Sequence, residues 1–351
     1  MMNETGYFTR QEILSQPEAW AAALEQLKKR RADLESLDLG RYTEILFTGC
    51  GSTYYLALAA AALTQELTGR LCRAFPASEL WLSPAASYST GRTLLVAVSR
   101  SGATTETLRA SLDFIANGRG DLVTLSCYAD QPLAKMATLA LVLPSGQEHS
   151  VAQTRAFSTL YLGTVALACL RAGRLDLFGL LDRLPETGRR LLDDTASLAA
   201  DLGRDDSLDR FYFLGSGARH GLACELSLKM KEMSLSHSEP FHFMEFRHGP
   251  KSMVTPSTLV VGLRSSVNGS HEAEVLAEVD ALGGQTLTMG EEASASPRGL
   301  DRTVWFESGL EEAVRNVLYL PVGQLIAFER SLAKGLNPDR PTNLDPVVKL
   351  S

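Results

Sequence analysis

Apolar runs of strand length alternate with helical patterns through the first half of the chain. Each run is bounded by glycine or polar residues, and the helical patterns between them are rich in alanine and leucine. Strands and helices in strict alternation are typical of a parallel sheet covered on both faces. Strands are predicted at 43–51, 73–75, 93–99, 121–127 and 139–145, and helices at 9–35, from residue 52 onward, at 104–117 and at 151–171.

The same order begins again in the second half. Residues 209–217 repeat the strand-into-glycine turn of 43–51, and residues 259–266 correspond to 94–101. The separation between turn and second strand is similar in both halves, which indicates an internal duplication. The sequence therefore predicts an α/β fold with two doubly wound, flavodoxin-like parallel-sheet domains (αβα sandwiches). Ligands of such folds bind beyond the carboxyl ends of the strands.

Four segments follow from this pattern. Charged, leucine-spaced residues 172–208 look like a helical connector between the halves, and 310–334 like a last helix. We predict an N-terminal helical segment (1–38), a first domain (39–190), a second domain (191–335) and a C-terminal tail (336–351).

Composition and charge narrow the class of partner. Hydrophobic residues make up 45% of the chain and charged residues 21%, with a net charge of −7 and no long basic run, so we expect no nucleic acid partner. The five cysteines are scattered and fit reduced thiols in a cytoplasm. The polar N-terminus does not resemble a signal peptide, and the apolar window 56–63 is too short to span a bilayer, so we expect no membrane association.

Small hydroxyl residues gather in a loop that follows the predicted strand 93–99 and opens a helix. Its sequence is Ser-Arg-Ser-Gly-Ala-Thr-Thr over 99–105, and the turn after the first strand adds Gly-Ser-Thr over 51–53. Helix N-termini offer free backbone N–H groups and a partial positive charge, and hydroxyls donate to phosphate oxygens. Ordinary helix capping is the alternative, but it explains one hydroxyl and not several at two strand ends. We predict phosphate binding by Ser52, Thr53, Ser99, Arg100, Ser101 and Thr104.

Two other phosphate motifs do not fit the chain. No G-x-x-x-x-G-K-S/T segment is present, and residues 215–221 form a poor G-x-G-x-x-G without an acidic residue at the end of a following strand. A nucleotide cofactor is therefore not expected. The second repeat carries Arg-Ser-Ser over 264–266 without the following glycine, which makes it the weaker phosphate candidate.

Acid–base chemistry is predicted in the block 225–250. Lys229 and Glu232 lie three residues apart on a helical pattern and so share a face, and His248 follows in an Arg-His-Gly-Pro loop. A carboxylate on a helix and an imidazole on a loop are the two groups that sugar isomerisation needs, since one moves a proton on carbon and the other on oxygen. A surface Glu–Lys pair and an ordinary loop histidine are the alternative.

A metal site is a poor interpretation of the same block. His237, His242 and His248 match no standard zinc spacing, and Pro240 interrupts any common helix. We expect neither a metal nor another cofactor.

Taken together, these motifs resemble the tandem sugar isomerase (SIS) domain family. The resemblance rests on the GCGST turn, the S-R-S-G-x-T loop, the duplication and the L-K-x-K-E … H-G-P block, and it covers nearly the whole chain. Two groups of this family are similar to the chain: the isomerase half of glucosamine-6-phosphate synthase and the stand-alone amino-sugar-phosphate deaminase/isomerases. The resemblance to the stand-alone group is strongest in two segments, FRHGPKSMV and TRQEILSQPEAW.

The resemblance implies roles for matching residues only. It implies that Ser99, Ser101 and Thr104 hold the phosphate. Arg100 stands where the family has a glutamine, and two alternatives remain open for it: its side chain strengthens phosphate binding, or it faces solvent. It implies that Thr53 stands for the turn serine. Sugar contacts are implied for Gly51, Glu148, Val151 and Ala152.

Catalytic roles are implied in the same way. Glu232 matches the family's glutamate with Lys229 as its partner, and His248 matches the histidine that opens the sugar ring and reaches across a dimer interface, so a homodimer is expected. The family's synthase has a tail lysine that forms a Schiff base, but Pro346 stands at that position and Lys349 lies three residues on. No glutaminase domain precedes the duplication, so glutamine-dependent synthesis by this chain alone is not expected.

The resemblance therefore implies a phosphosugar aldose–ketose isomerase/deaminase. We expect glucosamine or galactosamine 6-phosphate to give ketose 6-phosphate and ammonia. The phosphate is expected to bind at the hydroxyl-rich loop, which would leave the first two carbons of the sugar beside Glu232. The alternatives are a deglycase of phosphorylated sugar–amine adducts, a non-catalytic sugar-phosphate regulator, and a binding protein for another anion.

Overall fold

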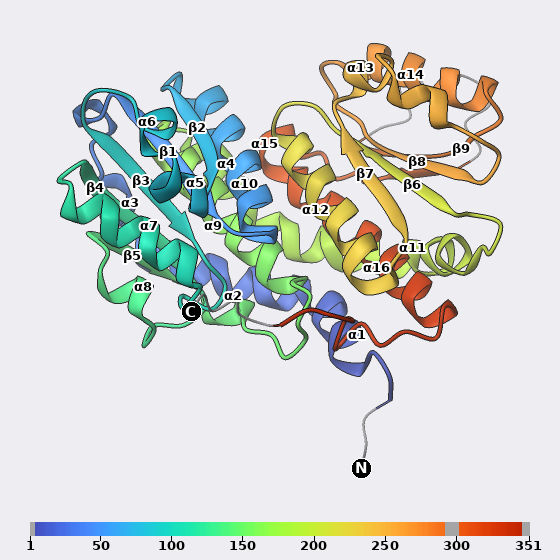
Figure 1. Ribbon diagram of the computed structural model, residues 1–351, viewed down its shortest axis with the longest axis horizontal. Coiled ribbons are helices and arrows are strands. Elements are labelled where there is room, and N and C mark those ends of the chain that lie inside the picture. Colours follow the sequence, from blue (N-terminus) through green and yellow to red (C-terminus); the bar gives the residue numbers. More distant parts are fainter. Residues whose placement is uncertain (1–3, 292–301, 346–351) are drawn as a thin grey trace. The chain divides into compact units, whose positions relative to one another are not determined.

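The computed structural model describes residues 4–291 and 302–345, and its contacts divide the chain into two compact units. The N-repeat unit comprises Ser15–His149, Gln153–Pro185 and Asp345–Ser351. The C-repeat unit comprises Met1–Leu14, Ser150–Ala152 and Glu186–Leu344. Each unit contains one five-stranded sheet with helices against it (Figure 1).

The sheet of the N-repeat unit is entirely parallel, in the order β2-β1-β3-β4-β5. This is the 2-1-3-4-5 order of flavodoxin-like sheets, so the predicted fold class is confirmed for this half. Its strands are β1 (Glu44–Gly49), β2 (Cys72–Pro76), β3 (Thr93–Val98), β4 (Gly120–Ser126) and β5 (Leu139–Val142). Its helices are α2 (Gln16–Lys29), α3 (Arg31–Glu35), α4 (Ser52–Thr68), α5 (Ala77–Leu82), α6 (Pro84–Ser87), α7 (Thr105–Ala116), α8 (Pro132–Lys135), α9 (Arg155–Arg171) and α10 (Leu175–Leu180), with short 3₁₀ turns at Leu39–Arg41, Pro144–Gly146 and Leu181–Arg183.

Alternating side chains of the central strands form two separate cores. Leu46 of β1, Leu95 of β3 and Leu122 of β4 lie in one buried cluster with residues of α5 and α7, including Phe114. Side chains on the other face of the sheet lie against α4, which packs on β1 and on α9. Both faces of β1 and β3 are buried, which explains why these strands are continuous apolar runs in the sequence.

The sheet of the C-repeat unit has the same topology. Its order is β7-β6-β8-β9-β10, again entirely parallel. Its strands are β6 (Arg210–Leu214), β7 (His237–Phe241), β8 (Thr258–Leu263), β9 (Gln285–Gly290) and β10 (Thr303–Trp305). Its helices are α1 (Tyr7–Leu14), α11 (Leu184–Arg204), α12 (Ala218–Ser234), α13 (Phe243–Phe246), α14 (Gly269–Ala281), α15 (Glu312–Arg315) and α16 (Tyr319–Ala333), with 3₁₀ turns at Pro250–Met253 and Asn316–Leu318.

The glycine turns after β1 and β6 show that the two halves are duplicates in detail. A Cβ atom on Gly49 would lie 2.6 Å from the backbone of Thr53, and one on Gly215 would lie 2.4 Å from the backbone of Arg219. Two residues later each turn has a glycine at positive φ, +55° at position 51 and +58° at position 217, and a 17-residue helix follows in both halves. The predicted internal duplication is therefore confirmed.

Several predicted elements have different limits in the structure. Pro240, where the predicted helix block was expected to break into a loop, lies within β7, which is an edge strand that tolerates a residue without an N–H donor. The expected helix at 9–35 is divided into α1, α2 and α3, the one at 151–171 begins only at Arg155, and the last helix is broken between α15 and α16. Strands β9 and β10 were not predicted.

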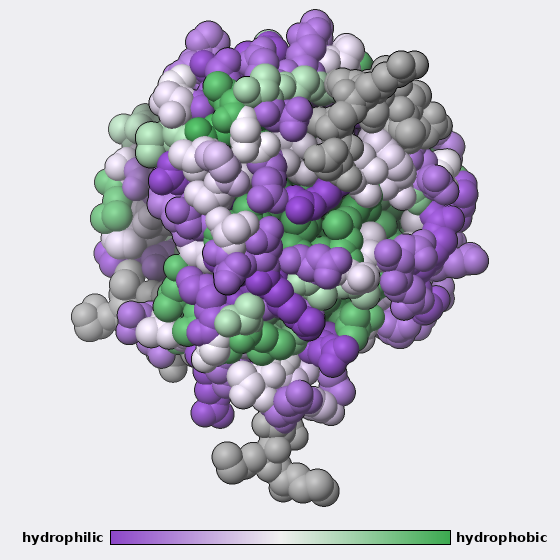
Figure 2. Space-filling view, turned by 90° about the vertical axis from the view of Figure 1, so that its right-hand side faces the viewer, coloured by the Kyte–Doolittle hydropathy of each residue, from purple (hydrophilic) through white to green (hydrophobic). Residues whose placement is uncertain are grey.

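The surface and the cysteines agree with a folded domain protein. The face shown in Figure 2 is mostly hydrophilic, with apolar patches between the polar side chains. All five cysteines are free thiols, as predicted, and Cys127, Cys169 and Cys224 are buried. None of the helices within the described residues is both long and apolar enough to span a bilayer.

Candidate active site

The predicted hydroxyl residues lie at one edge of the N-repeat sheet. Gly51, Ser52 and Thr53 follow β1, and residues 99–104 follow β3. Because β1 and β3 are paired parallel neighbours, their carboxyl ends meet at the same edge. The two strand ends that the sequence singled out are therefore adjacent.

Three hydroxyl groups of the loop after β3 lie close together. The Ser99 hydroxyl accepts a hydrogen bond from the Gly102 N–H (3.1 Å) and lies 3.2 Å from the Thr104 hydroxyl. The Ser101 hydroxyl accepts from the Ala103 N–H (3.2 Å) and lies 3.5 Å from that of Thr104. In the described part of the chain the backbone N–H of Ser101 has no hydrogen-bond partner. The loop thus presents an open N–H beside clustered hydroxyls at the start of α7.

The turn after β1 contributes differently. The Thr53 hydroxyl accepts from the Cys50 N–H (2.9 Å) and donates to the Cys50 carbonyl (3.0 Å), so it closes the turn itself. Gly51 has φ +55°, and a Cβ atom placed there would meet no atom within 4 Å. Ser52 is the first residue of α4 and is buried. The turn therefore offers open backbone at Gly51 for a close approach by a ligand.

Arg100 does not face solvent, which was one of the two possibilities left open by the sequence. Its side chain is buried, with Nη1 3.5 Å from Glu148 Oε2. The other carboxylate oxygen of Glu148 accepts from the N–H and the hydroxyl of Thr154, both at 2.8 Å, just before α9. Glu148 therefore joins the loop after β3 to the start of α9, a link that the sequence did not indicate.

The other two predicted sugar residues belong to the C-repeat unit. The Val151 N–H donates to the Asp339 carbonyl (3.2 Å), and Ala152 is buried. The Asp339 carboxylate in turn accepts from the Thr9 N–H (2.7 Å), the Thr9 hydroxyl (2.8 Å) and the Phe8 N–H (3.3 Å) at the start of α1. Three distant parts of the sequence thus meet at Asp339.

The predicted Lys229–Glu232 pair forms on α12 and is not a surface pair. Lys229 has no exposed surface, its ammonium forms an ion pair with Glu232, and its Nζ lies 3.3 Å from Glu225 Oε1 on the preceding turn. The side chain of Glu225 is also fully buried, whereas that of Glu232 is 19% exposed. Glu225, Lys229 and Glu232 form a row of charged side chains on α12. Glu232 is the one member of this row that a ligand can reach. The role of Glu225, four residues before the lysine, was missed although the helical spacing contains it.

The two glutamates of the row determine the protonation state of Lys229. Burial alone lowers the pKa of Lys229, but the charges of Glu225 and Glu232 outweigh it and raise that pKa above its ordinary value of 10.5. Lys229 stays an ammonium at neutral pH and cannot accept a proton. The side chain of the row that a ligand can reach is therefore a carboxylate, that of Glu232.

His248 lies after α13 in the same unit and is exposed. Its backbone N–H donates to the Glu245 carbonyl (2.9 Å), which holds the loop in a helical turn. Among residues 4–291 and 302–345 its imidazole makes no hydrogen bond or ion pair, and so none with Glu232. The structure thus leaves the imidazole available without assigning it a partner.

A histidine pair that the sequence did not indicate lies near the start of α12. The rings of His220 and His242 stack with centroids 3.8 Å apart, and Cys224 Sγ lies 3.6 Å from His220 Nε2. Burial and the charge of His242 lower the pKa of His220 to about 4, so its ring is neutral at pH 7 and packs as an aromatic group. No group of three or more possible metal ligands is gathered within the part of the chain that the structure describes.

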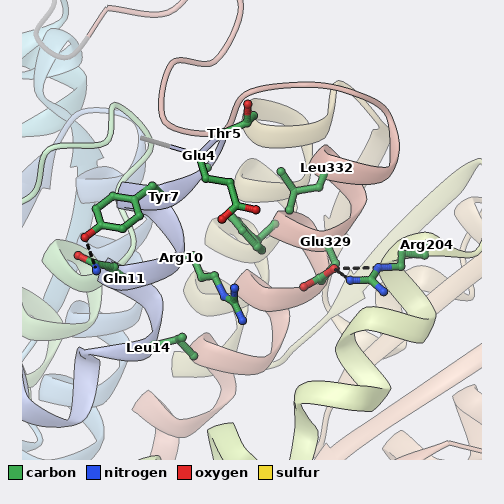
Figure 3. Close-up of a pocket in the computed structure, with 11 residues that line it drawn as sticks. Glu4, Thr5, Tyr7, Arg10, Gln11, Leu14, Arg204, Glu329 and Leu332 are labelled. Atoms are coloured by element: carbon green, nitrogen blue, oxygen red, sulfur yellow. Dashed lines mark hydrogen bonds and ion pairs between the residues drawn. The ribbon is translucent and has the colours of Figure 1, made fainter. Parts of the chain in front are cut away.

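A cavity of about 480 Å³ in the C-repeat unit contains none of the predicted site residues. It lies between α1 and α16, and Figure 3 shows Glu4, Arg10 and Glu329 around it. The dashed lines in Figure 3 are the hydrogen bonds of Arg204 to Glu329 at 2.7 and 3.0 Å and that of the Gln11 amide to the Tyr7 hydroxyl at 2.7 Å. The candidate site is therefore defined by its chemistry and not by this cavity.

Sequence comparison finds relatives over nearly the whole chain. The glutamine–fructose-6-phosphate aminotransferase (isomerizing) of Methanothermobacter thermautotrophicus is 27% identical over 99% of this chain. The enzyme of the same name from Aeropyrum pernix is 30% identical over 99% of this chain. The chain spans only 58% of the length of either relative.

Structural comparison gives the same fold. The tagatose-6-phosphate ketose/aldose isomerase of Escherichia coli matches with a TM-score of 0.86 at 21% identity, over 97% of this chain and 96% of that one. The glucosamine-6-phosphate deaminase of Thermotoga maritima matches with a TM-score of 0.75 at 27% identity, over 94% of this chain and all of that one (100%). The SIS domain model matches residues 41–170 and 207–298, one match in each repeat and together more than half of the chain. This chain therefore belongs to the SIS domain family.

Proposed function

We propose that this chain is a sugar-phosphate isomerase/deaminase that converts an amino-sugar 6-phosphate to a ketose 6-phosphate and ammonia. The observation that carries the proposal is the row on α12, in which a buried ammonium holds one accessible carboxylate, Glu232. The names of the relatives support the substrate class, since they are a glutamine–fructose-6-phosphate aminotransferase, a tagatose-6-phosphate ketose/aldose isomerase and a glucosamine-6-phosphate deaminase.

The phosphate group is assigned to the loop after β3. The open N–H of Ser101, the hydroxyls of Ser99 and Thr104, and the N-terminus of α7 are the donors that an anion requires. The buried guanidinium of Arg100 adds positive charge beneath the loop, balanced by Glu148. Gly51 allows the ligand to approach the backbone of the adjacent turn.

The chemical step is a proton transfer between two carbons. His248 moves a proton from the anomeric hydroxyl to the ring oxygen, which opens the ring. Glu232 then takes the proton from C2, and the electron pair of that C–H bond forms a C1–C2 double bond as the C1 oxygen takes a proton from water. Lys229, which is fully buried, pairs with the Glu232 carboxylate and holds it in place for this transfer. When C2 carries an amine, return of the proton from Glu232 to C1 gives a C2 iminium, which loses one N–H proton to water and becomes the imine.

The last step needs only water. Water adds to the C2 imine and ammonia leaves, which gives the C2 ketone of the ketose phosphate. This route uses no enzyme lysine, in agreement with proline at position 346. Pro346 and Lys349 lie outside the described residues.

A panel of 6-phosphosugars tests the proposal. Glucosamine and galactosamine 6-phosphate are expected to release ammonia and ketose phosphate in equal amounts, and the Glu232→Gln variant is expected to release neither. Glu329→Gln, which changes a glutamate of α16 paired with Arg204, is the matched control and keeps activity. Turnover of a phosphorylated sugar–amine adduct alone would favour the deglycase, and phosphate binding without turnover of any substrate would favour the regulator.

A further inference from the structure

The C-repeat unit has a loop that corresponds to the phosphate loop, and it is occupied by the chain itself. β3 and β8 both have six residues. The first residue after each strand donates its N–H to a carbonyl of the neighbouring strand: Ser99 donates to Leu125 (3.0 Å) and Arg264 to Met289 (2.9 Å). Counting from these residues, Ser266 corresponds to Ser101. Serine hydroxyls accept from loop N–H groups in both repeats, as Ser265 does from Val267 (3.0 Å).

The difference between the loops lies in one N–H group. In the N-repeat unit the Ser101 N–H has no partner among the described residues. The corresponding Ser266 N–H donates to Glu312 Oε2 at 2.8 Å. The Ser265 hydroxyl donates to the same carboxylate at 2.9 and 3.3 Å. A carboxylate from α15 therefore takes the N–H and hydroxyl donors that the first repeat leaves for a ligand.

Buried arginines complete an anion site around this carboxylate. Arg219, at the position that Thr53 has in the first repeat, is buried and forms ion pairs with Glu312 and, at 3.3 Å, with Glu272. Arg315 is also buried, and its Nη2 donates to the Ser266 hydroxyl at 2.6 Å and lies 3.4 Å from Glu312 Oε2. Such charges are stable in the interior only when paired.

We propose that Glu312 is an internal ligand that closes the anion site of the second repeat. The chain then binds phosphate in the first repeat only, and removal of the Glu312 carboxylate opens a second site for inorganic phosphate or a phosphate monoester. The chemistry supports the exchange, because carboxylate and phosphate oxygens accept from the same N–H, hydroxyl and guanidinium donors. The inference rests on the proposed function only where it takes the first loop as the phosphate site.

The test counts phosphate sites on Glu312→Ala and on wild type by titration calorimetry with inorganic phosphate. The variant is expected to bind one phosphate more per chain than wild type. This difference is the readout, so it holds even if the first loop binds nothing and the proposed function fails. Glu329→Ala, which removes a glutamate from an ion pair with the exposed Arg204, is the control and gains no site.

Stability gives a second readout, which remains useful if Glu312→Ala folds poorly. Loss of the carboxylate leaves Arg219 and Arg315 undercompensated, so a lower unfolding midpoint is expected. Replacing chloride with phosphate at equal ionic strength is expected to raise that midpoint, or the refolding yield, well beyond the general effect seen in wild type and Glu329→Ala. An unchanged number of sites in a folded variant, or a variant that phosphate stabilises no more than the two controls, overturns the inference.

Discussion

Removal of the buried ammonium of Lys229 tests whether the charges of the α12 row stabilise the fold. Replacement of Lys229 with Met keeps the length and apolar volume of the side chain but removes the charge between Glu225 and Glu232. Glu232 is 19% exposed and can still be hydrated. Glu225 has no exposed surface and loses the cation that faces it at 3.3 Å. The perturbation therefore falls mainly on one buried carboxylate.

The magnitude follows from that burial. Breaking a buried ion pair by removal of one partner destabilises a protein by about 3–5 kcal/mol. We expect Lys229→Met to lose free energy of unfolding in this range. A second change, Glu225→Gln, removes the negative charge of this buried side chain, so the double variant is expected to regain about half of the loss or more. A recovery of stability in the double variant shows that the loss in Lys229→Met comes from the buried charge, because a packing defect would remain after the second substitution.

Urea unfolding followed by circular dichroism measures these differences. Because the folded state raises the pKa of Lys229 above 10.5, its contribution is fully present below that pH and is lost as the pH rises through the folded pKa. The deficit of Lys229→Met is therefore expected to be constant near neutral pH and to shrink only in strong alkali. A loss below about 1 kcal/mol, or a double variant no more stable than the single one, would refute the reasoning.

Two further predictions concern the loop and the chain ends. Ser99→Ala removes a hydroxyl assigned to the phosphate and is expected to raise KM for the phosphosugar at least tenfold with little change in kcat, since a hydrogen bond to a charged group contributes about 1.5–3 kcal/mol. Ser111→Ala on α7, whose hydroxyl donates to the Thr107 carbonyl, is the steady-state control, and equal KM values in the two variants would contradict the assignment. Asp339→Ala is expected to lower the free energy of unfolding by about 1–3 kcal/mol, because the N–H and hydroxyl of Thr9 lose their acceptor. Asp345→Ala is the exposed control in the same urea experiment, and equal stability of both variants would show that the contact at Asp339 contributes nothing.

The sequence predicted β1, β3, β6 and β8 because these strands are buried on both faces, whereas β9 was missed although it is also buried. A continuous apolar run is the direct result of that burial, as in β1, β3 and β8. The edge strand β7 escaped detection because it has exposed positions and contains Pro240, both of which are tolerated at an edge. The position of the domain boundaries at 38, 190 and 335 stays a prediction.

The candidate site was predictable where its parts are local in sequence. Helical spacing gave the pair of Lys229 and Glu232, and loop composition gave the clustered hydroxyls after β3. The contacts that sequence reasoning missed join distant segments: Arg100 with Glu148, Asp339 with Thr9, and Glu312 with the loop after β8. No periodicity connects residues that far apart, so only the folded chain brings them together.

Exchange of the C2 proton tests the central claim, that Glu232 is the base. Glucosamine 6-phosphate is incubated in D₂O with wild type or Glu232→Gln, and loss of the C2 proton signal is followed by NMR, while phosphate binding is measured in parallel. The account predicts exchange by wild type, none above background by Glu232→Gln, and equal phosphate affinity for both. Exchange by Glu232→Gln at the wild-type rate would contradict the account.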